Sequence, residues 1–177
     1  MKSIVFFLTA SILLFSCTEN STAYELHKLM QSYHDETLKM YPIQATSQGD
    51  NRYNDYLPNY LSNEVILKHK TFYKDILNEL DGIDHNLLSK EDKLSKKVMQ
   101  WECETSLMGL KFPIQLMPLD QMWTLQLTMG QMATGAGAQP FKTLIDYKNW
   151  LKRIDDYVIW LESAKNRMEE GIEKDIV

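Results

Sequence analysis

The stretch GQMATGAGAQPFKT, residues 130–143, has residue types that suit a phosphate-binding loop. Gly130 and Gly135 have the spacing of a Walker A loop, which also needs Lys and then Ser or Thr directly after its second glycine, at a helix N-terminus. An Ala-Gly pair occupies those two positions here. The dinucleotide-binding pattern fails too, because Pro140 stands where its third glycine would allow close helix packing. The stretch therefore predicts no nucleotide and no other cofactor.

The histidines are the candidate metal ligands. A zinc peptidase helix carries two His one turn apart, with a Glu between them as general base, and no such arrangement occurs in this sequence. His27 and His34 are two turns apart on a predicted helix, with Asp35 and Glu36 beside them. A metal site needs three or four convergent ligands, so we interpret this pair as surface or partly buried helix residues. The sequence predicts no catalytic residue and no metal ligand.

An apolar run over residues 4–15 follows Lys2. It is shorter than the ~20 residues of a bilayer-spanning helix, but it fits the apolar region of a secretory signal peptide. We therefore predict that residues 1–16 are a signal peptide and not part of the fold.

The apolar run ends in Leu-Phe-Ser-Cys, which resembles the bacterial lipobox, although Phe15 is bulkier than the residue usually found there. We predict that Cys17 is lipidated and that residues 17–22 are a polar tether. Each buried methylene of a lipid contributes ~0.8 kcal/mol, so more than one acyl chain would anchor the protein stably. The partner is then a membrane, and the location is the bacterial cell envelope, on its periplasmic or surface face. The alternative is an ordinary secretory signal with an incidental Cys17.

The second cysteine, Cys103, then has no partner for an intramolecular disulfide. No neighbouring base suggests a catalytic thiol, so we predict that Cys103 is a small buried side chain.

The net charge of the chain is −5, whereas nucleic-acid-binding proteins usually carry a net positive charge. No nucleic-acid partner is predicted.

The chain after the tether has mainly helical periodicity. Apolar residues spaced by three and four, together with capping residues, predict about five helices, over residues 24–41, 62–82, 89–108, 143–154 and 155–171. A long connection follows Pro42, and residues 112–141 are predicted to be extended or irregular because polar and apolar side chains alternate from Trp123 to Met129. The predicted fold class is mainly α.

Two helix faces are predicted to point into the core. On the third helix this face is formed by Leu94, Val98, Trp101, Thr105 and Met108. On the last helix it is formed by Ile154, Tyr157, Val158, Leu161, Ala164, Met168 and Ile172. Ile159 and part of Trp160 lie outside that face, and we expect them to be exposed as a surface for further polypeptide.

Several segments in the same order resemble the N-terminal part of the bacterial domain-of-unknown-function 885 family. They are YPIQATSQGDNRYNDYLPNYLSNE, the turn at residues 117–121, PFKTLIDYKNWLKRI and NRMEEGIEKDIV. The resemblance implies a mostly helical zinc-dependent peptidase of the gluzincin type, with its His-Glu-x-x-His helix later in a longer chain. Residues 23–177 are accordingly expected to be the truncated N-terminal portion of a larger domain, inactive alone, with zinc only in the missing C-terminal part.

Two functions fit these features. The first is the non-catalytic N-terminal portion of a lipid-anchored, zinc-dependent peptidase-like hydrolase, which would hold peptide substrate in the full-length protein. The alternative is a non-catalytic surface lipoprotein that binds peptides or glycans through exposed Trp and Tyr side chains. The candidate side chains are Tyr53, Tyr56, Tyr60, Trp123 and Trp150, for which packing inside the fold is the simpler interpretation.

The anchor can be tested by metabolic labelling with a palmitate analogue. We expect the wild-type chain to be labelled and the Cys17→Ser chain to lose the label, because the Cys17 thiol is the predicted attachment point. Equal labelling of the two chains would contradict the prediction.

Overall fold

The computed structural model describes residues 21–122 and 124–176, which form helices and no strand. This confirms the predicted mainly α class. The α-helices are α2 (Ser21–Met40), α3 (Pro42–Ser47), α4 (Asn63–Gly82), α5 (Lys90–Gly109), α6 (Leu125–Ala133) and α7 (Leu144–Glu173). The short 3-10 helices are η2 (Asn51–Tyr53), η3 (His85–Leu87) and η4 (Ile114–Leu116). No helix in this part of the chain has an apolar stretch sufficient to cross a membrane.

The predicted signal peptide and Cys17 lie outside the described residues. Helix α2 begins at Ser21, so the last two residues of the predicted tether, 17–22, are helical.

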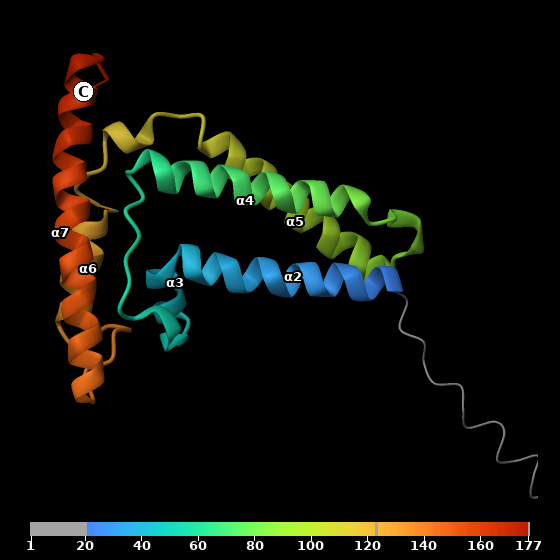
Figure 1. The fold of residues 1–177 in the computed structure, drawn as a ribbon, viewed down its shortest axis with the longest axis horizontal. Coiled ribbons are helices and arrows are strands. Elements are labelled where there is room, and N and C mark those ends of the chain that lie inside the picture. Colours follow the sequence, from blue (N-terminus) through green and yellow to red (C-terminus); the bar gives the residue numbers. More distant parts are fainter. Residues whose placement is uncertain (1–20, 123, 177) are drawn as a thin grey trace, which may run out of the picture.

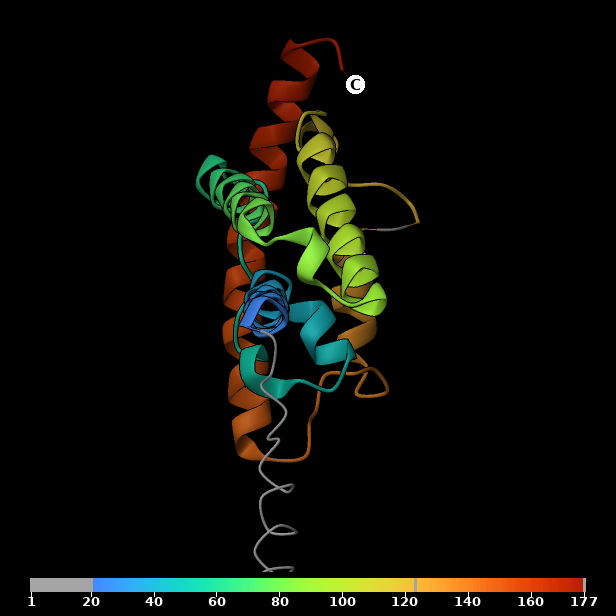
Figure 2. The same ribbon diagram turned by 90° about the vertical axis from the view of Figure 1, so that its right-hand side faces the viewer.

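Helices α2, α4 and α5 form a three-helix bundle (Figures 1 and 2). Its core is a cluster of buried side chains from all three helices and the α4–α5 connection: Leu26, Leu29, Tyr73, Ile76, Leu80, Ile83, Leu88, Met99 and Cys103. The predicted helix starts are confirmed, because the hydroxyl groups of Ser62 and Ser89 accept the backbone N–H groups of Val65 (3.2 Å) and Asp92 (3.0 Å). Local capping therefore sets where α4 and α5 begin.

Helix α7 stands across one end of this bundle, and α6 lies beside it (Figure 1). Residues 53–63, which we call the linking segment, run along α7 between η2 and the start of α4 (Figure 1). A small apolar cluster joins the two, with Leu61 of the linking segment packed against Trp160 and Ala164 of α7.

The linking segment has few helical hydrogen bonds of its own, so α7 side chains pair with its backbone. Asp156 accepts the N–H of Leu57 (2.9 Å), and Nε of Arg167 donates to the carbonyl of Leu61 (2.9 Å). Buried backbone groups need such partners. The polar face of α7 is thus fixed against this segment.

Arg153 makes the most extensive of these contacts and is fully buried. Its guanidinium donates to the carbonyls of Tyr53 (2.5 Å) and Tyr56 (3.2 Å), to Oε1 of Gln139 (2.7 Å) and to Oγ1 of Thr46 (3.1 Å). All four acceptors are neutral, and burial lowers the pKa of Arg153 to about 10. One side chain therefore connects α3, the linking segment, the α6–α7 loop and α7.

The prediction that residues 112–141 are extended or irregular is partly wrong, because this stretch contains η4 and α6. The apolar residues of 125–133 also satisfy a helical period, and Met129 and Met132 are buried on one face of α6. Leu, Gln and Met favour the helix intrinsically. The connection after Pro42 is likewise shorter than predicted, since it contains α3 and η2.

The two predicted C-terminal helices are one continuous helix, α7. The predicted break at residue 155 does not occur. The Asp156 carboxylate accepts the backbone N–H of Leu57 in the linking segment and does not cap the start of a new helix. Gly171 is not the C-cap: it is buried inside the last turn, and the left-handed residue after the helix is Asp175, with φ 54°.

The predicted core face is wrong for α5 and partly wrong for α7. On α5 the buried residues are Lys96, Met99 and Cys103, and the predicted face is largely exposed, as at Leu94 (64 %) and Trp101 (65 %). The Lys96 ammonium donates to the carbonyl of Ile83 (2.7 Å), which holds this side of α5 inward.

On α7 the expected exposure of Ile159 is confirmed, at 54 %, but that of Trp160 is wrong, at 4 %. Four of the seven residues of the predicted core face of α7 are exposed, among them Val158 (48 %) and Ile172 (63 %), whereas Ala164 is buried as predicted. The reason is that Arg153, Asp156 and Arg167 lie on the same face of the helix as Trp160, and their bonds to the linking segment orient it.

Replacing Arg153 by Met should lower the free energy of unfolding by about 3 kcal/mol, because it leaves buried carbonyl and amide groups without donors. Urea denaturation of the full chain measures this. Lys152→Met is the matched control: its exposed ion pair with Asp55 (3.0 Å) should contribute at most about 1 kcal/mol. Equal losses in the two variants would contradict the role given to Arg153.

Candidate functional site

The glycine-rich stretch that resembles a phosphate loop leads into α7. The N–H groups of Lys142 and Thr143 both donate to a carboxylate oxygen of Asp146 (3.0 and 2.8 Å), and the Thr143 hydroxyl accepts the Asp146 N–H (3.2 Å). The amides that a phosphate would need are thus paired with a carboxylate. Gly135 has φ 74°, a conformation that glycine adopts without strain.

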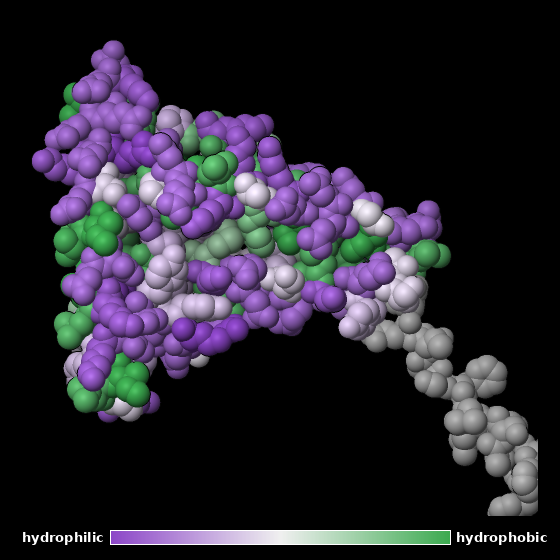
Figure 3. All heavy atoms as spheres, viewed as in Figure 1, coloured by the Kyte–Doolittle hydropathy of each residue, from purple (hydrophilic) through white to green (hydrophobic). Residues whose placement is uncertain are grey.

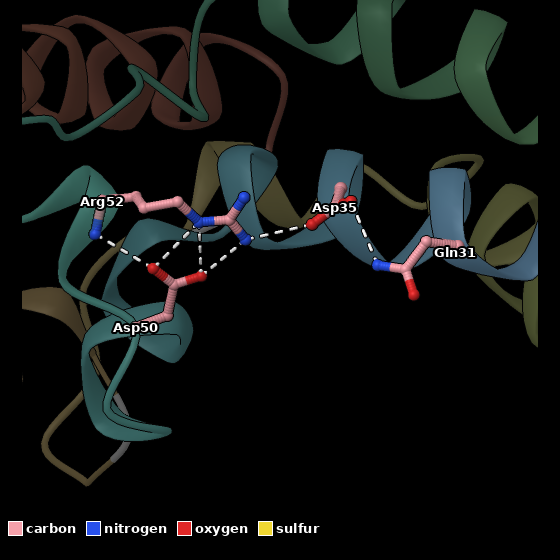
Figure 4. A network of polar contacts seen from close by, with 4 residues as sticks. All are labelled: Gln31, Asp35, Asp50 and Arg52. Carbon is pink, nitrogen blue, oxygen red and sulfur yellow. Dashed lines mark hydrogen bonds and ion pairs between the residues drawn. The ribbon is translucent and has the colours of Figure 1, made fainter.

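The histidines of α2 do not converge. His27 contacts the Asp92 carboxylate (2.8 Å) at the far end of the bundle, whereas Asp35, next to His34, is engaged by Arg52. Figure 4 shows this second network: Arg52 donates to Asp35 (3.0 Å) and Asp50 (2.7 Å), and Gln31 donates to Asp35 (3.1 Å). Hydrogen bonds from Gln31 and Arg52 hold the pKa of Asp35 below its usual value. In residues 21–122 and 124–176, no group of three His, Cys, Asp or Glu side chains could hold a metal ion.

Cys103 is buried in the bundle core, as predicted. Burial is the main reason that the pKa of its thiol is raised to about 11. At neutral pH the thiol is protonated, so Cys103 packs as a small apolar group and does not act as a nucleophile.

Two adjoining hollows, of about 430 and 440 Å³, lie where the bundle meets α6 and α7. They share six lining residues, which together we call the aromatic groove: Tyr41, Tyr60, Leu61, Pro118, Thr124 and Leu125. Trp160 of α7 lines the first hollow, and His69 of α4 lines the second. Mostly apolar hollows with a few polar groups are the usual form of a ligand site.

Four parts of the chain bring these residues together. Tyr41 ends the turn after α2, where Pro42 prevents the helix from continuing in the same direction. Tyr60 and Leu61 come from the linking segment, which α7 holds in place. Pro118 comes from the loop between η4 and α6, and Leu125 is the first residue of α6. The groove therefore depends on the same contacts that orient α7.

Aromatic rings form its inner wall. Tyr41 and Tyr60 stack with ring centroids 6.1 Å apart. The rings of His69 and Tyr41 form a T-shaped pair with centroids 5.4 Å apart. The Tyr41 hydroxyl lies 3.0 Å from that of Tyr73. Burial raises the pKa of Tyr41 and Tyr60 and lowers that of His69. At neutral pH all these groups are uncharged, so the wall suits apolar side chains that carry a hydrogen-bonding group.

The sequence indicated part of this site. Tyr60 was among the candidate binding aromatics and does line the groove, whereas Tyr56 is exposed outside it and Trp123 lies outside the described residues. Tyr41 and His69 were not identified. They are 28 positions apart, Tyr41 between α2 and α3 and His69 within α4, so no local spacing could have linked them.

His69 should make the fold sensitive to acid. Because the folded chain disfavours its protonated form, the unfolded chain binds that proton more readily below the ordinary pKa of about 6.5. Stability is therefore lost as pH falls through that value, by at most about 1.4 kcal/mol per pH unit for this residue. His69→Phe should reduce the loss measured by urea denaturation between pH 7.5 and 5.5, whereas His34→Phe, on the exposed side of α2, should not. An unchanged pH dependence in His69→Phe would contradict this assignment.

The comparisons with known proteins give one result. No significant match occurs among curated proteins or among solved structures. The family model described as bacterial protein of unknown function, DUF885, matches residues 42–177, which is more than half of the chain and includes every helix from α3 to α7. This chain therefore belongs to the DUF885 family of bacterial proteins.

Proposed function

We propose that this chain is the non-catalytic N-terminal portion of a lipid-anchored, zinc-dependent peptidase-like hydrolase of the bacterial envelope. In this proposal the aromatic groove is a wall of the site that holds a peptide substrate. The observation that carries it is the composition of the groove: stacked Tyr41 and Tyr60, the apolar residues Leu61 and Leu125, and Trp160 at one side. Family membership and the resemblance of the quoted segments support it.

The described residues do not fit a zinc site, so no chemical step is assigned to them. What they can do is bind. Uncharged phenol and imidazole groups next to apolar side chains favour aromatic or leucine-like side chains of a peptide, whose backbone can hydrogen bond at the polar edge formed by Gln44, Thr124 and Thr128. The zinc and the general base belong, in this proposal, to a separate catalytic portion.

The lipid on Cys17 would hold the groove at the membrane. Cys17 is only four positions before Ser21, where α2 begins, so the chain between them can span at most about 14 Å. A hydrolase anchored so closely would meet peptides at the membrane surface of the envelope.

The alternative, a non-catalytic lipoprotein that binds glycans, is favoured by the aromatic rings of the groove. Sugars stack on free ring faces, however, and Tyr41 and Tyr60 use one face each to stack on one another. The geometry therefore favours peptides, and the two ligand classes can be compared directly.

The test is calorimetric titration of the full chain with hexapeptides that carry aromatic or leucine side chains, and in parallel with chitin oligosaccharides. We expect the peptides to bind and Thr128→Trp to weaken that binding at least 10-fold, because the new side chain fills the first hollow. Leu127→Trp is the matched control, since Leu127 is the preceding residue of α6, does not line the groove and is 43 % exposed. Binding of oligosaccharides alone would favour the alternative, and equal effects of the two substitutions would rule out the groove as the site.

A further inference from the structure

His69 is a polar side chain at an inward position of α4. The buried residues of this helix are His69, Tyr73, Ile76 and Leu80, spaced by three and four on one face. The last three belong to the bundle core, whereas His69 comes one turn earlier and lines the second hollow. Figure 3 shows hydrophobic residues in the space between α2 and α4, whose outer sides are mainly hydrophilic. An imidazole thus stands where packing alone would favour an apolar side chain.

The imidazole makes ring contacts but no hydrogen bond within the part of the chain that the structure describes. Its ring lies against those of Tyr41 and Tyr60, with centroids 5.4 and 6.3 Å away, and no described group hydrogen bonds with its nitrogens. Only 8 % of His69 is exposed. The Tyr41 hydroxyl, by contrast, is engaged with that of Tyr73 (3.0 Å). Since buried polar groups are normally hydrogen-bonded, the unused nitrogens of His69 point to a ligand.

The lining of the second hollow limits the chemistry of that ligand. The hollow has a volume of about 440 Å³, and Ile66, Leu110, Phe112 and Met117 contribute apolar walls. Of the residues described there, none is Lys or Arg, and Asp120 is the acidic one. A carboxylate ligand is therefore disfavoured. An uncharged aromatic ring suits the walls, and a hydroxyl on that ring can donate to the acceptor nitrogen of a neutral imidazole.

We propose that the second hollow takes a phenol group, in the form of a tyrosine side chain of the bound peptide, and that the phenol hydroxyl donates to His69. The inference rests on the proposed function, in which the groove holds a peptide, and it names the side chain that the peptide must carry. His69 determines specificity and takes no part in a chemical step. A phenylalanine would fill the same space and leave a buried imidazole nitrogen without a partner, so the pocket selects Tyr over Phe.

The second nitrogen of the imidazole has a separate environment available. His69 also lines a smaller hollow of about 320 Å³, which Glu36, Lys39 and Lys68 make more polar. A neutral imidazole has one N–H and one acceptor nitrogen. The N–H can be solvated in the polar hollow while the acceptor nitrogen receives the phenol.

Calorimetric titration of the full chain with p-cresol and with toluene tests the pocket, because these two probes differ only in the hydroxyl group. We expect p-cresol to bind at least about 10-fold more tightly, since toluene leaves the imidazole unpaired. His69→Phe should abolish this preference, whereas the matched control His34→Phe, on the exposed side of α2, should keep it. Equal binding of the two probes to the wild-type chain, or an unchanged preference in His69→Phe, overturns the proposal.

The wild-type chain alone provides a second measurement, which holds even if His69→Phe does not fold. The chain has four histidines, whose ring nitrogens can be followed in ¹⁵N spectra. Addition of p-cresol should shift the ring signals of one histidine, identified as His69 by its contacts with the tyrosine rings. Toluene should not produce the same shift. If p-cresol shifts no histidine, or shifts another one, the proposal is wrong.

Two hexapeptides that differ only by Tyr or Phe at one position separate this inference from the proposed function. Binding of the Tyr peptide at least about 10-fold more tightly supports both. Equal binding of the two peptides supports the groove as a peptide site but overturns the specificity given to His69. Failure of both peptides to bind, while p-cresol binds as expected, overturns the peptide as the source of the phenol and the proposed function with it.

Discussion

The structure depends on how the backbone of the linking segment is satisfied. Between Tyr53 at the end of η2 and Asn63 at the start of α4, the chain crosses the end of the bundle that faces α7 without regular secondary structure (Figure 1). A buried carbonyl or N–H without a partner costs about 1–3 kcal/mol. Helix α7 supplies those partners through Arg153, Asp156 and Arg167. Because these side chains recur at helical spacing on one face, they fix both the position and the rotation of α7.

That rotation explains the apolar surface. Burial of one apolar side chain stabilises the fold by roughly 1.5–3 kcal/mol, which is comparable to the cost of leaving one of these buried backbone groups without a partner. Several such hydrogen bonds, together with burial of Trp160, therefore stabilise this rotation of α7 more than burial of its opposite apolar face would. The opposite face of α7, which includes Leu151, Val158 and Ile172, is left in solvent as a result. On α5 the Lys96 contact with the Ile83 carbonyl, together with burial of Met99 and Cys103, has the same effect.

The aromatic groove follows from the same arrangement. Tyr60 and Leu61 belong to the linking segment, and Trp160 lies between Arg153 and Arg167 on α7, so the contacts that hold the segment also build the wall. His69 and Tyr41 complete it from the bundle. A binding surface made in this way is rigid on the α7 side, where the hydrogen bonds are, and its ligand contacts are made by side chains that the fold has already positioned.

The sequence alone determined the mainly α class, the starts of α4, α5 and α7 and the burial of Cys103. These features are local: a Ser or Thr cap acts within one turn, and a small thiol among apolar residues goes inside. Only the tertiary structure decided which face of α5 and α7 is buried, that α7 is a single helix and that Tyr41 and His69 meet. The outcomes on α7 depend on hydrogen bonds between residues about 100 positions apart, such as Arg153 with Tyr53. The others depend on contacts between different elements, Lys96 with Ile83 and Tyr41 with His69, and no periodicity within one helix can reveal any of them.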